Sequence, residues 1–201
     1  MDISKKGQLL LFPPPELNDY LIVVSPPLEI KKETKKLNDK LNKMIGTKST
    51  HNAHISLFSQ AWEKDNHLLE RLKKAIADVK SFPVSLNGVE VFSHGTKKKT
   101  VYLKVENPKP IQQLYEACKS ELKIRKEFVP HLTIEKNIPI ADFEKIQNDL
   151  GMFNHQCEWT CDRITVLRFN KKTSSYKLVE EIALKDATAS WSHLAWCFSF
   201  F

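Results

Sequence analysis

Hydrophobic positions change period repeatedly along the first 107 residues. An apolar run at 20–24 predicts a buried strand. From 28 to 45, apolar residues recur at helical spacing between lysines, and Gly46 supplies a helix stop. Alternation at 53–58 predicts another strand, and apolar positions between 68 and 79 mark one face of a second helix. This part of the chain closes with two paired strands, over 82–92 and 100–105, joined by a basic tip.

The second half of the chain repeats this order. The pattern predicts helices over 111–122 and 140–150 and strands over 129–135, 157–169 and 176–184. Such a duplication predicts an α+β fold of two lobes, with two antiparallel sheets facing a central groove. We expect a single bilobal domain over residues 1–185, whose halves meet near residue 107.

The final segment, 186–201, lies outside the repeat and is rich in aromatic residues. We expect it to dock on the body of the protein, because exposed aromatic side chains in bulk are uncommon. Docking on a partner protein is the alternative.

Composition is ordinary for a globular protein, with 41% hydrophobic and 27% charged residues among 201. The formal charge of +7 favours an acidic partner, and nucleic acid, nucleotide and anionic membrane all fit by charge alone.

The N-terminal apolar run ends at three prolines and is too short for a signal peptide or a membrane span, which favours the cytoplasm. Four scattered cysteines lack zinc-site spacing. We expect neither a metal nor a cofactor. No obligatory protein partner is evident, and we expect a monomer.

One tetrapeptide pattern occurs twice, as histidine, aliphatic residue, hydroxyl residue, aliphatic residue. The copies start at His54 and His131, 77 positions apart, each in the equivalent predicted strand of its half. Because side chains alternate between the faces of a strand, His54 should share a face with Ser56, and His131 with Thr133. The aliphatic neighbours should point into the core.

These motifs resemble those of the 2H phosphoesterase superfamily, and residues 128–135 (FVPHLTIE) are similar to its second motif in full. The resemblance extends over roughly residues 18–185, and the bacterial 2′-5′ RNA ligase-like and cyclic phosphodiesterase branch is the most similar. It implies that His54 and His131 are catalytic across one groove and that Ser56 and Thr133 bind phosphate.

In-line displacement at phosphorus needs a base on the attacking side and an acid on the leaving side, and imidazole suits both tasks. The hydroxyls can donate hydrogen bonds to non-bridging phosphate oxygens. The resemblance therefore implies a metal-independent phosphodiesterase acting on 2′,3′-cyclic phosphates or 2′-5′ bonds of RNA or nucleotides, with reversible 2′-5′ ligation as a further activity. Within the family the second motif usually supplies the base, which favours His131. The alternative is a non-catalytic RNA- or nucleotide-binding protein that uses the same basic groove.

Four further residues are candidates for substrate binding. Tyr102 and Lys104 share one face of a strand and could meet a base and a phosphate, or form an ordinary exposed face. Phe58 should share a face with the first motif and could stack on a nucleobase, although core packing is the alternative. Lys136 follows the second motif and could bind phosphate or be solvated.

Overall fold

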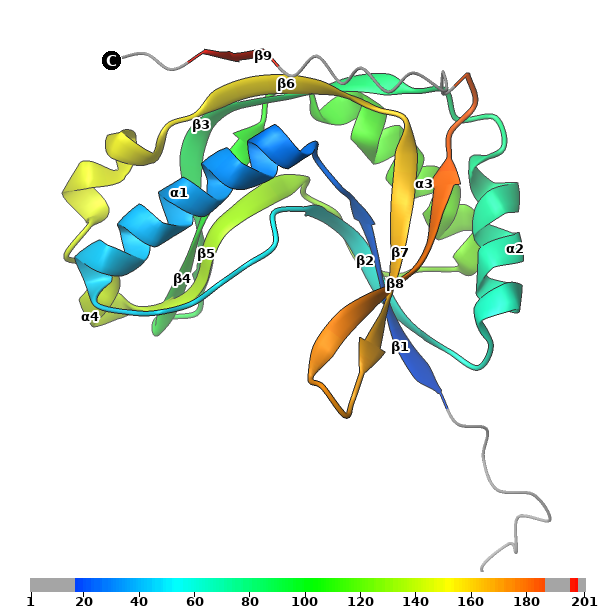
Figure 1. Cartoon of the computed structure of the whole chain (residues 1–201), viewed down its shortest axis with the longest axis horizontal. Helices are drawn as coiled ribbons and strands as arrows, with labels where there is room; N and C mark the ends of the chain where they lie inside the picture. Colours follow the sequence, from blue (N-terminus) through cyan, green and yellow to red (C-terminus); the bar gives the residue numbers. More distant parts are fainter. Residues whose placement is uncertain (1–16, 187–195, 199–201) are drawn as a thin grey trace, which may run out of the picture.

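The structure is a computed structural model, and the residues that it describes are 17–186 and 196–198 (Figure 1). It contains two antiparallel sheets, as predicted. The four-stranded sheet has the order β2-β1-β7-β8 and comprises β1 (Asn18–Val24), β2 (Ile55–Trp62), β7 (Arg163–Asn170) and β8 (Ser175–Ala183). The five-stranded sheet has the order β5-β4-β3-β6-β9 and comprises β3 (Phe82–His94), β4 (Lys98–Val105), β5 (His131–Pro139), β6 (Gln156–Cys161) and β9 (Trp196–Phe198).

Each sheet takes strands from both halves of the chain. A boundary near residue 107 therefore does not separate the two sheets. The strand predicted over 157–169 was wrong, because it is two strands of different sheets. β6 pairs with β3 and β7 pairs with β1, so the chain crosses from one sheet to the other at Asp162.

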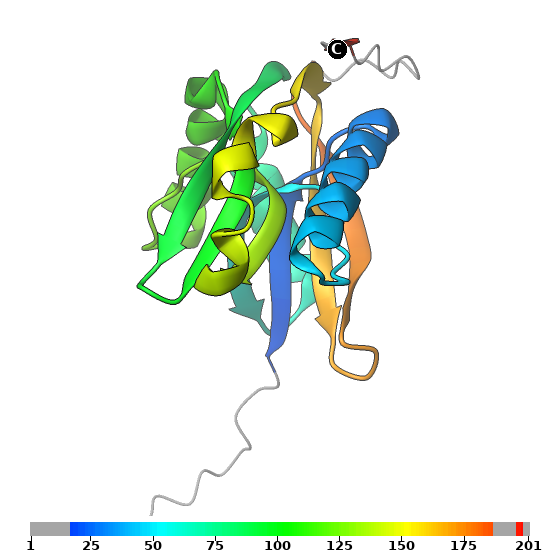
Figure 2. The same cartoon turned by 90° about the vertical axis from the view of Figure 1, so that its left-hand side faces the viewer.

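Three longer helices cover the outer faces of the sheets: α1 (Leu28–Ile45), α2 (Asp65–Ile76) and α3 (Pro108–Leu122). Although α1 connects β1 to β2 of the four-stranded sheet, it packs on β5 of the other sheet, where the Asn38 amide donates to the Ile134 carbonyl (2.8 Å). Conversely, α3 connects β4 to β5 but contacts β2 and α2, through Tyr115 against Phe58 and an Arg71–Glu121 ion pair (3.2 Å). The two connecting helices lie on opposite sides of the molecule (Figure 2), so each ties one sheet to the other.

The helix predicted over 140–150 forms only in part. The structure has a short α4 (Ile140–Phe143) followed by a 3-10 helix, η1 (Gln147–Phe153). Between these two short helices the Ile146 N–H donates to the Phe143 carbonyl (3.0 Å), a bond of the 3-10 type, and both of these side chains are buried.

Buried side chains of both sheets form one hydrophobic core. Within the described ranges, no helix combines the length and apolar character needed to cross a membrane. Part of the aromatic tail, β9, pairs with β6, as expected for docking on the body, with Cys197 opposite Cys157. The rest of the tail lies outside the described residues.

Candidate active site

Both histidine motifs show the predicted alternation of buried and accessible side chains. On β5, His131 and Thr133 are half-buried, whereas Leu132 and Ile134 between them are fully buried. On β2, Ser56 is half-buried between two buried aliphatic residues, and His54 immediately precedes the strand. Each motif therefore presents its polar side chains on the face opposite the core.

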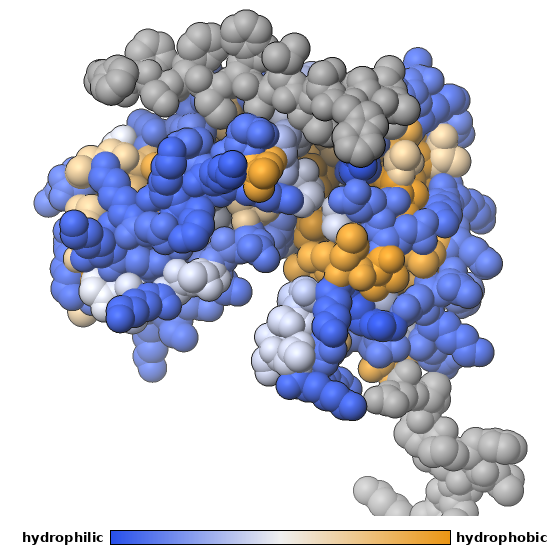
Figure 3. Space-filling model, viewed as in Figure 1, coloured by the Kyte–Doolittle hydropathy of each residue, from blue (hydrophilic) through white to orange (hydrophobic). Residues whose placement is uncertain are grey.

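The two motifs come from neighbouring edge strands of different sheets. β2 and β5 are each the outermost strand of their sheet, and they contact each other where the sheets meet. The positive charge of Lys136 on β5 lowers the pKa of His54, which lies just before β2, so the two motifs are within electrostatic reach of each other. An open notch separates the two parts of the molecule (Figure 3).

The His131 ring is held by one hydrogen bond and two aromatic neighbours. Its Nδ1 lies 2.8 Å from the Val129 carbonyl oxygen, which can only accept, so Nδ1 is the donor and Nε2 is left with a lone pair in the neutral ring. The rings of Phe92 and Tyr102 contact the imidazole edge-on, at centroid distances of 4.9 and 5.2 Å. Burial lowers the pKa of His131, which favours this neutral form.

His54 lies in a more positive environment. Burial lowers the pKa of His54, while its hydrogen bond to the Asn52 backbone acts in the opposite direction. The positive charges of Lys136, His51 and Lys31 lower the pKa of His54 further. Lys136 is exposed and pairs with no carboxylate in the described part of the chain, so its charge is available to an anion.

Tyr102 and Lys104 share one face of β4, as predicted. This is the face of the second motif, since Tyr102 is opposite Thr133 and Lys104 is opposite His131. Tyr102 is only 5% exposed and stacks on Phe92 (4.1 Å between centroids). Its hydroxyl donates to Glu90 (2.8 Å), and burial raises the pKa of Tyr102 to about 12. Tyr102 therefore supports the His131 ring, whereas Lys104 is exposed and forms an ion pair with Glu90 (2.9 Å).

The prediction that Phe58 shares a face with His54 and Ser56 was wrong. Ser56 pairs with Val23 and Phe58 pairs with Ile22, which leaves Leu57 as the extra residue of a β-bulge. The bulge turns Phe58 into the core, where it is 5% exposed and lies edge-on to the Tyr115 ring. Phe58 is therefore a packing residue and is not placed to stack on a nucleobase.

Sequence reasoning assigned no role to Glu135, the last residue of the second motif, whose carboxylate is buried at 4% exposure. It accepts hydrogen bonds from Asn38 (2.8 Å) and Ser49, and it pairs with His51 (3.0 Å). Burial would raise the pKa of Glu135, but the bonds from His51, Ser49 and Asn38 outweigh it and lower the pKa. Since Ser49 and His51 belong to the loop that leads into His54, Glu135 fastens this loop to β5. The available signal was an acid directly after the two buried aliphatic residues of the motif, Leu132 and Ile134.

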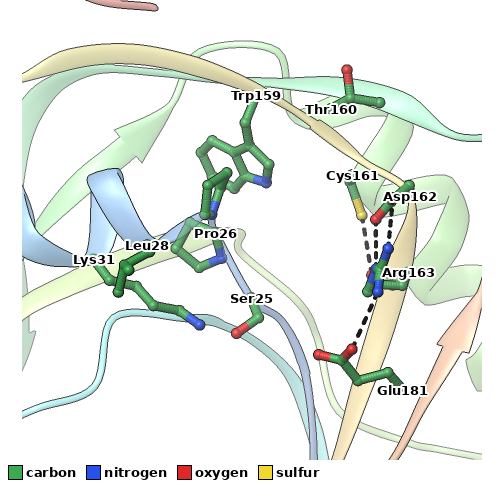
Figure 4. A pocket seen from close by; sticks show the side chains of 11 residues that line it. Ser25, Pro26, Leu28, Lys31, Trp159, Thr160, Cys161, Asp162, Arg163 and Glu181 are labelled. Carbon is green, nitrogen blue, oxygen red and sulfur yellow. Dashed lines mark hydrogen bonds and ion pairs between the residues drawn. The ribbon is translucent and has the colours of Figure 1, made fainter. Parts of the chain in front are cut away.

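A cavity of about 200 Å³ lies at the start of α1 and is lined by neither catalytic candidate (Figure 4). Its Arg163 is paired with Asp162 (2.9 Å) and Glu181 (3.2 Å). Two carboxylates thus neutralise this guanidinium. Lys31 also lines the cavity, and its charge is one of those that lower the pKa of His54. The histidine motifs are therefore the better candidate for phosphate chemistry.

Comparison with known proteins identifies the class. The family model of the 2′-5′ RNA ligase superfamily matches residues 26–173, so the chain belongs to this superfamily of 2H phosphoesterases. A Geobacillus kaustophilus relative named "Putative phosphoesterase" is 27% identical over 157 residues, covering 74% of this chain and 86% of the relative. One from Geobacillus sp. (strain WCH70) is 28% identical over 120 residues, covering 57% and 68%.

Two solved structures share the fold. Escherichia coli LigT has a TM-score of 0.62 at 15% identity, covering 84% of this chain and 98% of LigT. The Thermus thermophilus protein TT0787 also has a TM-score of 0.62, at 18% identity, covering 83% and 98%. At these identities the likeness shows the fold, and the family match places the protein among enzymes of the phosphoesterase class.

Proposed function

We propose that the protein is a metal-independent phosphodiesterase that acts on 2′,3′-cyclic phosphates or 2′-5′ phosphodiester bonds of RNA or nucleotides. The observation that carries the proposal is the matched pair of motifs on contacting edge strands. His54 and His131 are the proposed catalytic residues, and Ser56 and Thr133 the phosphate ligands. The E. coli LigT structures with 3′-AMP and with phosphate are consistent with such a substrate class.

The proposed reaction is a displacement at phosphorus that breaks the bond to the 3′ oxygen. His131 Nε2 takes a proton from the attacking water, and protonated His54 gives one to the leaving 3′ oxygen, so the product is a 2′-phosphate. With an RNA 5′-hydroxyl as the attacking group, the same steps form a 2′-5′ bond. In the reverse direction the two imidazoles exchange roles.

The hydroxyls of Ser56 and Thr133 are available for the phosphate. Neither makes a hydrogen bond to protein within residues 17–186, and both are half-buried. Donation to the non-bridging oxygens would hold the phosphorus between the imidazoles and stabilise charge that builds up in the transition state. The exposed Lys136 adds positive potential, which favours an anionic substrate, whereas the charge of Lys104 is compensated by Glu90.

The test is hydrolysis of a nucleoside 2′,3′-cyclic phosphate in EDTA. We expect turnover by the wild type and a loss of about 10²–10⁴-fold in kcat for His54→Ala and for His131→Ala. His67→Ala is the matched control, because His67 is exposed on α2, and it should retain activity. Full rates in both motif variants would refute the catalytic assignment. RNA binding by a wild type that lacks turnover would favour the binding module.

A further inference from the structure

A row of apolar side chains runs from the first motif to the β7–β8 hairpin on one face of the four-stranded sheet. Val23 is opposite both Ser56 and Thr165, so these three residues share a face. On β7, Leu167 and Phe169 lie two and four residues after Thr165, so their side chains project from the same face of the sheet as Ser56.

The partner strand extends this row. On β8, Leu178 is opposite Leu167 and Tyr176 is opposite Phe169. Leu178 is 62% exposed and Tyr176 is 46% exposed, so apolar and aromatic surface remains accessible on the face that carries the first motif. The hairpin lies beside the notch between the two parts of the molecule (Figures 1 and 3).

The aromatic pair at the hairpin forms one wall of a cavity. Phe169 and Tyr176 lie edge-to-face, 5.3 Å between centroids, and line a cavity of about 350 Å³ with Ser59 and Gln60 of β2. That volume is in the range of small-molecule sites, about 300–1,000 Å³. Asp19 also lines it. A carboxylate repels phosphate but accepts hydrogen bonds from the amino groups of a base, so a nucleobase suits this cavity.

Phe169 also borders a region that is rich in lysine side chains. A second cavity, of about 460 Å³, is lined by Lys171, Lys172 and Lys177. None of these lysines forms an ion pair with a described residue, whereas the neighbouring Arg168 is held by Asp65 (2.7 Å). Lys171 and Lys172 belong to the hairpin turn, whereas Lys177 is opposite Arg168 and therefore projects from the other face of the sheet than Phe169 and Tyr176. These uncompensated charges surround the end of the hairpin, and they suit a phosphate backbone.

We infer that, in a single-stranded RNA substrate, the β7–β8 hairpin binds the nucleotide that precedes the one carrying the reactive 2′,3′-cyclic phosphate. Tyr176 and Phe169 stack on its base, and Lys171, Lys172 and Lys177 contact the backbone, the combination that single strands favour. This inference rests on the proposed function of the histidine motifs.

The distance along the sheet excludes a mononucleotide from filling both sites. Ser56 and Thr165 lie at the same level of the sheet, because both are opposite Val23 of β1. Phe169 is four residues further along β7 than Thr165. At about 3.3 Å per residue this is about 13 Å, further than a nucleoside extends from its own phosphate. An oligonucleotide spans it.

Kinetics on two substrates test the inference. For Tyr176→Ala we expect kcat/KM to fall about tenfold on an oligoribonucleotide 2′,3′-cyclic phosphate, mainly through KM, and to stay unchanged on a nucleoside 2′,3′-cyclic phosphate. An equal effect on both substrates, or on neither, would overturn the hairpin site. Wild-type turnover of the nucleoside substrate reports separately on the proposed function.

Binding provides a readout that does not need catalysis. In a His131→Ala background, anisotropy of a fluorescent single-stranded RNA should show about tenfold weaker binding for Tyr176→Ala. Replacing Lys171, Lys172 and Lys177 by Gln should reduce the slope of log K against log salt by about 2, since each phosphate contact contributes about 0.7. Gln at the exposed Lys32, Lys43 and Lys109 removes the same charge as a control. Equal slopes for the two triple variants, or RNA affinity indifferent to Tyr176, would contradict the inference.

Discussion

The His51 imidazole lies 3.0 Å from the buried Glu135 carboxylate, and this contact joins the loop that carries one proposed catalytic histidine to the strand that carries the other. Glu135 also accepts from Ser49 of the same loop and from Asn38 of α1. Three elements thus converge on one carboxylate, so the spacing of the two motifs depends on it.

Removing this carboxylate should disturb both stability and activity. Glu135→Ala removes one of the two acceptors of the Asn38 amide and the acceptor of the His51 ring. We expect a loss of about 2–3 kcal/mol in the free energy of unfolding, measured by urea denaturation. We also expect kcat to fall about tenfold, because His54 loses its fixed position. Glu144→Ala, at an exposed position, is the control. Wild-type stability and rate in Glu135→Ala would show that the loop is held by other contacts.

The pH profile should reflect two histidines with lowered pKa values. The base acts when deprotonated and the acid when protonated, and burial lowers the pKa of both rings below the ordinary value near 6.5. Both limbs of the kcat/KM profile therefore move to lower pH, and we expect an optimum below about 6.5. The charge of bound phosphate favours protonation, so the kcat profile should lie at higher pH than the kcat/KM profile. A kcat/KM optimum on the alkaline side of neutrality would contradict this electrostatic picture.

Lys136 should set part of the low pKa of His54. Its positive charge disfavours the imidazolium, so Lys136→Met should raise the pKa of His54 and shift the limb of the kcat/KM profile that reports the acid to higher pH. NMR titration of the His54 ring measures this directly, and Lys43→Met removes a charge from the exposed face of α1 as the control. Identical His54 titrations in the two variants would eliminate Lys136 as the cause.

The hydroxyl of Thr133 should matter more than its methyl group. Thr133→Val keeps the shape but removes the donor, and we expect kcat to fall about 10²-fold, as for loss of one donor to a developing oxyanion. Thr133→Ser keeps the donor and should recover most of the rate. Steady-state kinetics on a nucleoside 2′,3′-cyclic phosphate measure both variants, and equal rates for Val and Ser would remove Thr133 from the proposed mechanism.

The local periodicity of the sequence determined several secondary-structure elements and the faces of their side chains. The sequence alone predicts the bounds of α1, the pairing of β3 with β4, and the shared face of His131 and Thr133. These features repeat every 3.6 or every two residues, so neighbouring residues suffice to specify them. The doubled motif also indicated the family and the candidate catalytic residues.

Only the tertiary structure decided how these elements combine. The crossing between sheets at Asp162, the bulge at Leu57 and the convergence of loop, helix and strand on Glu135 all depend on partners distant in the chain. The alternation of apolar and polar residues is the same whether a segment stays in one sheet or crosses to another, because the period does not determine which strands the segment pairs with. The same holds for the hairpin that we assign to RNA, whose relation to the first motif follows from strand register.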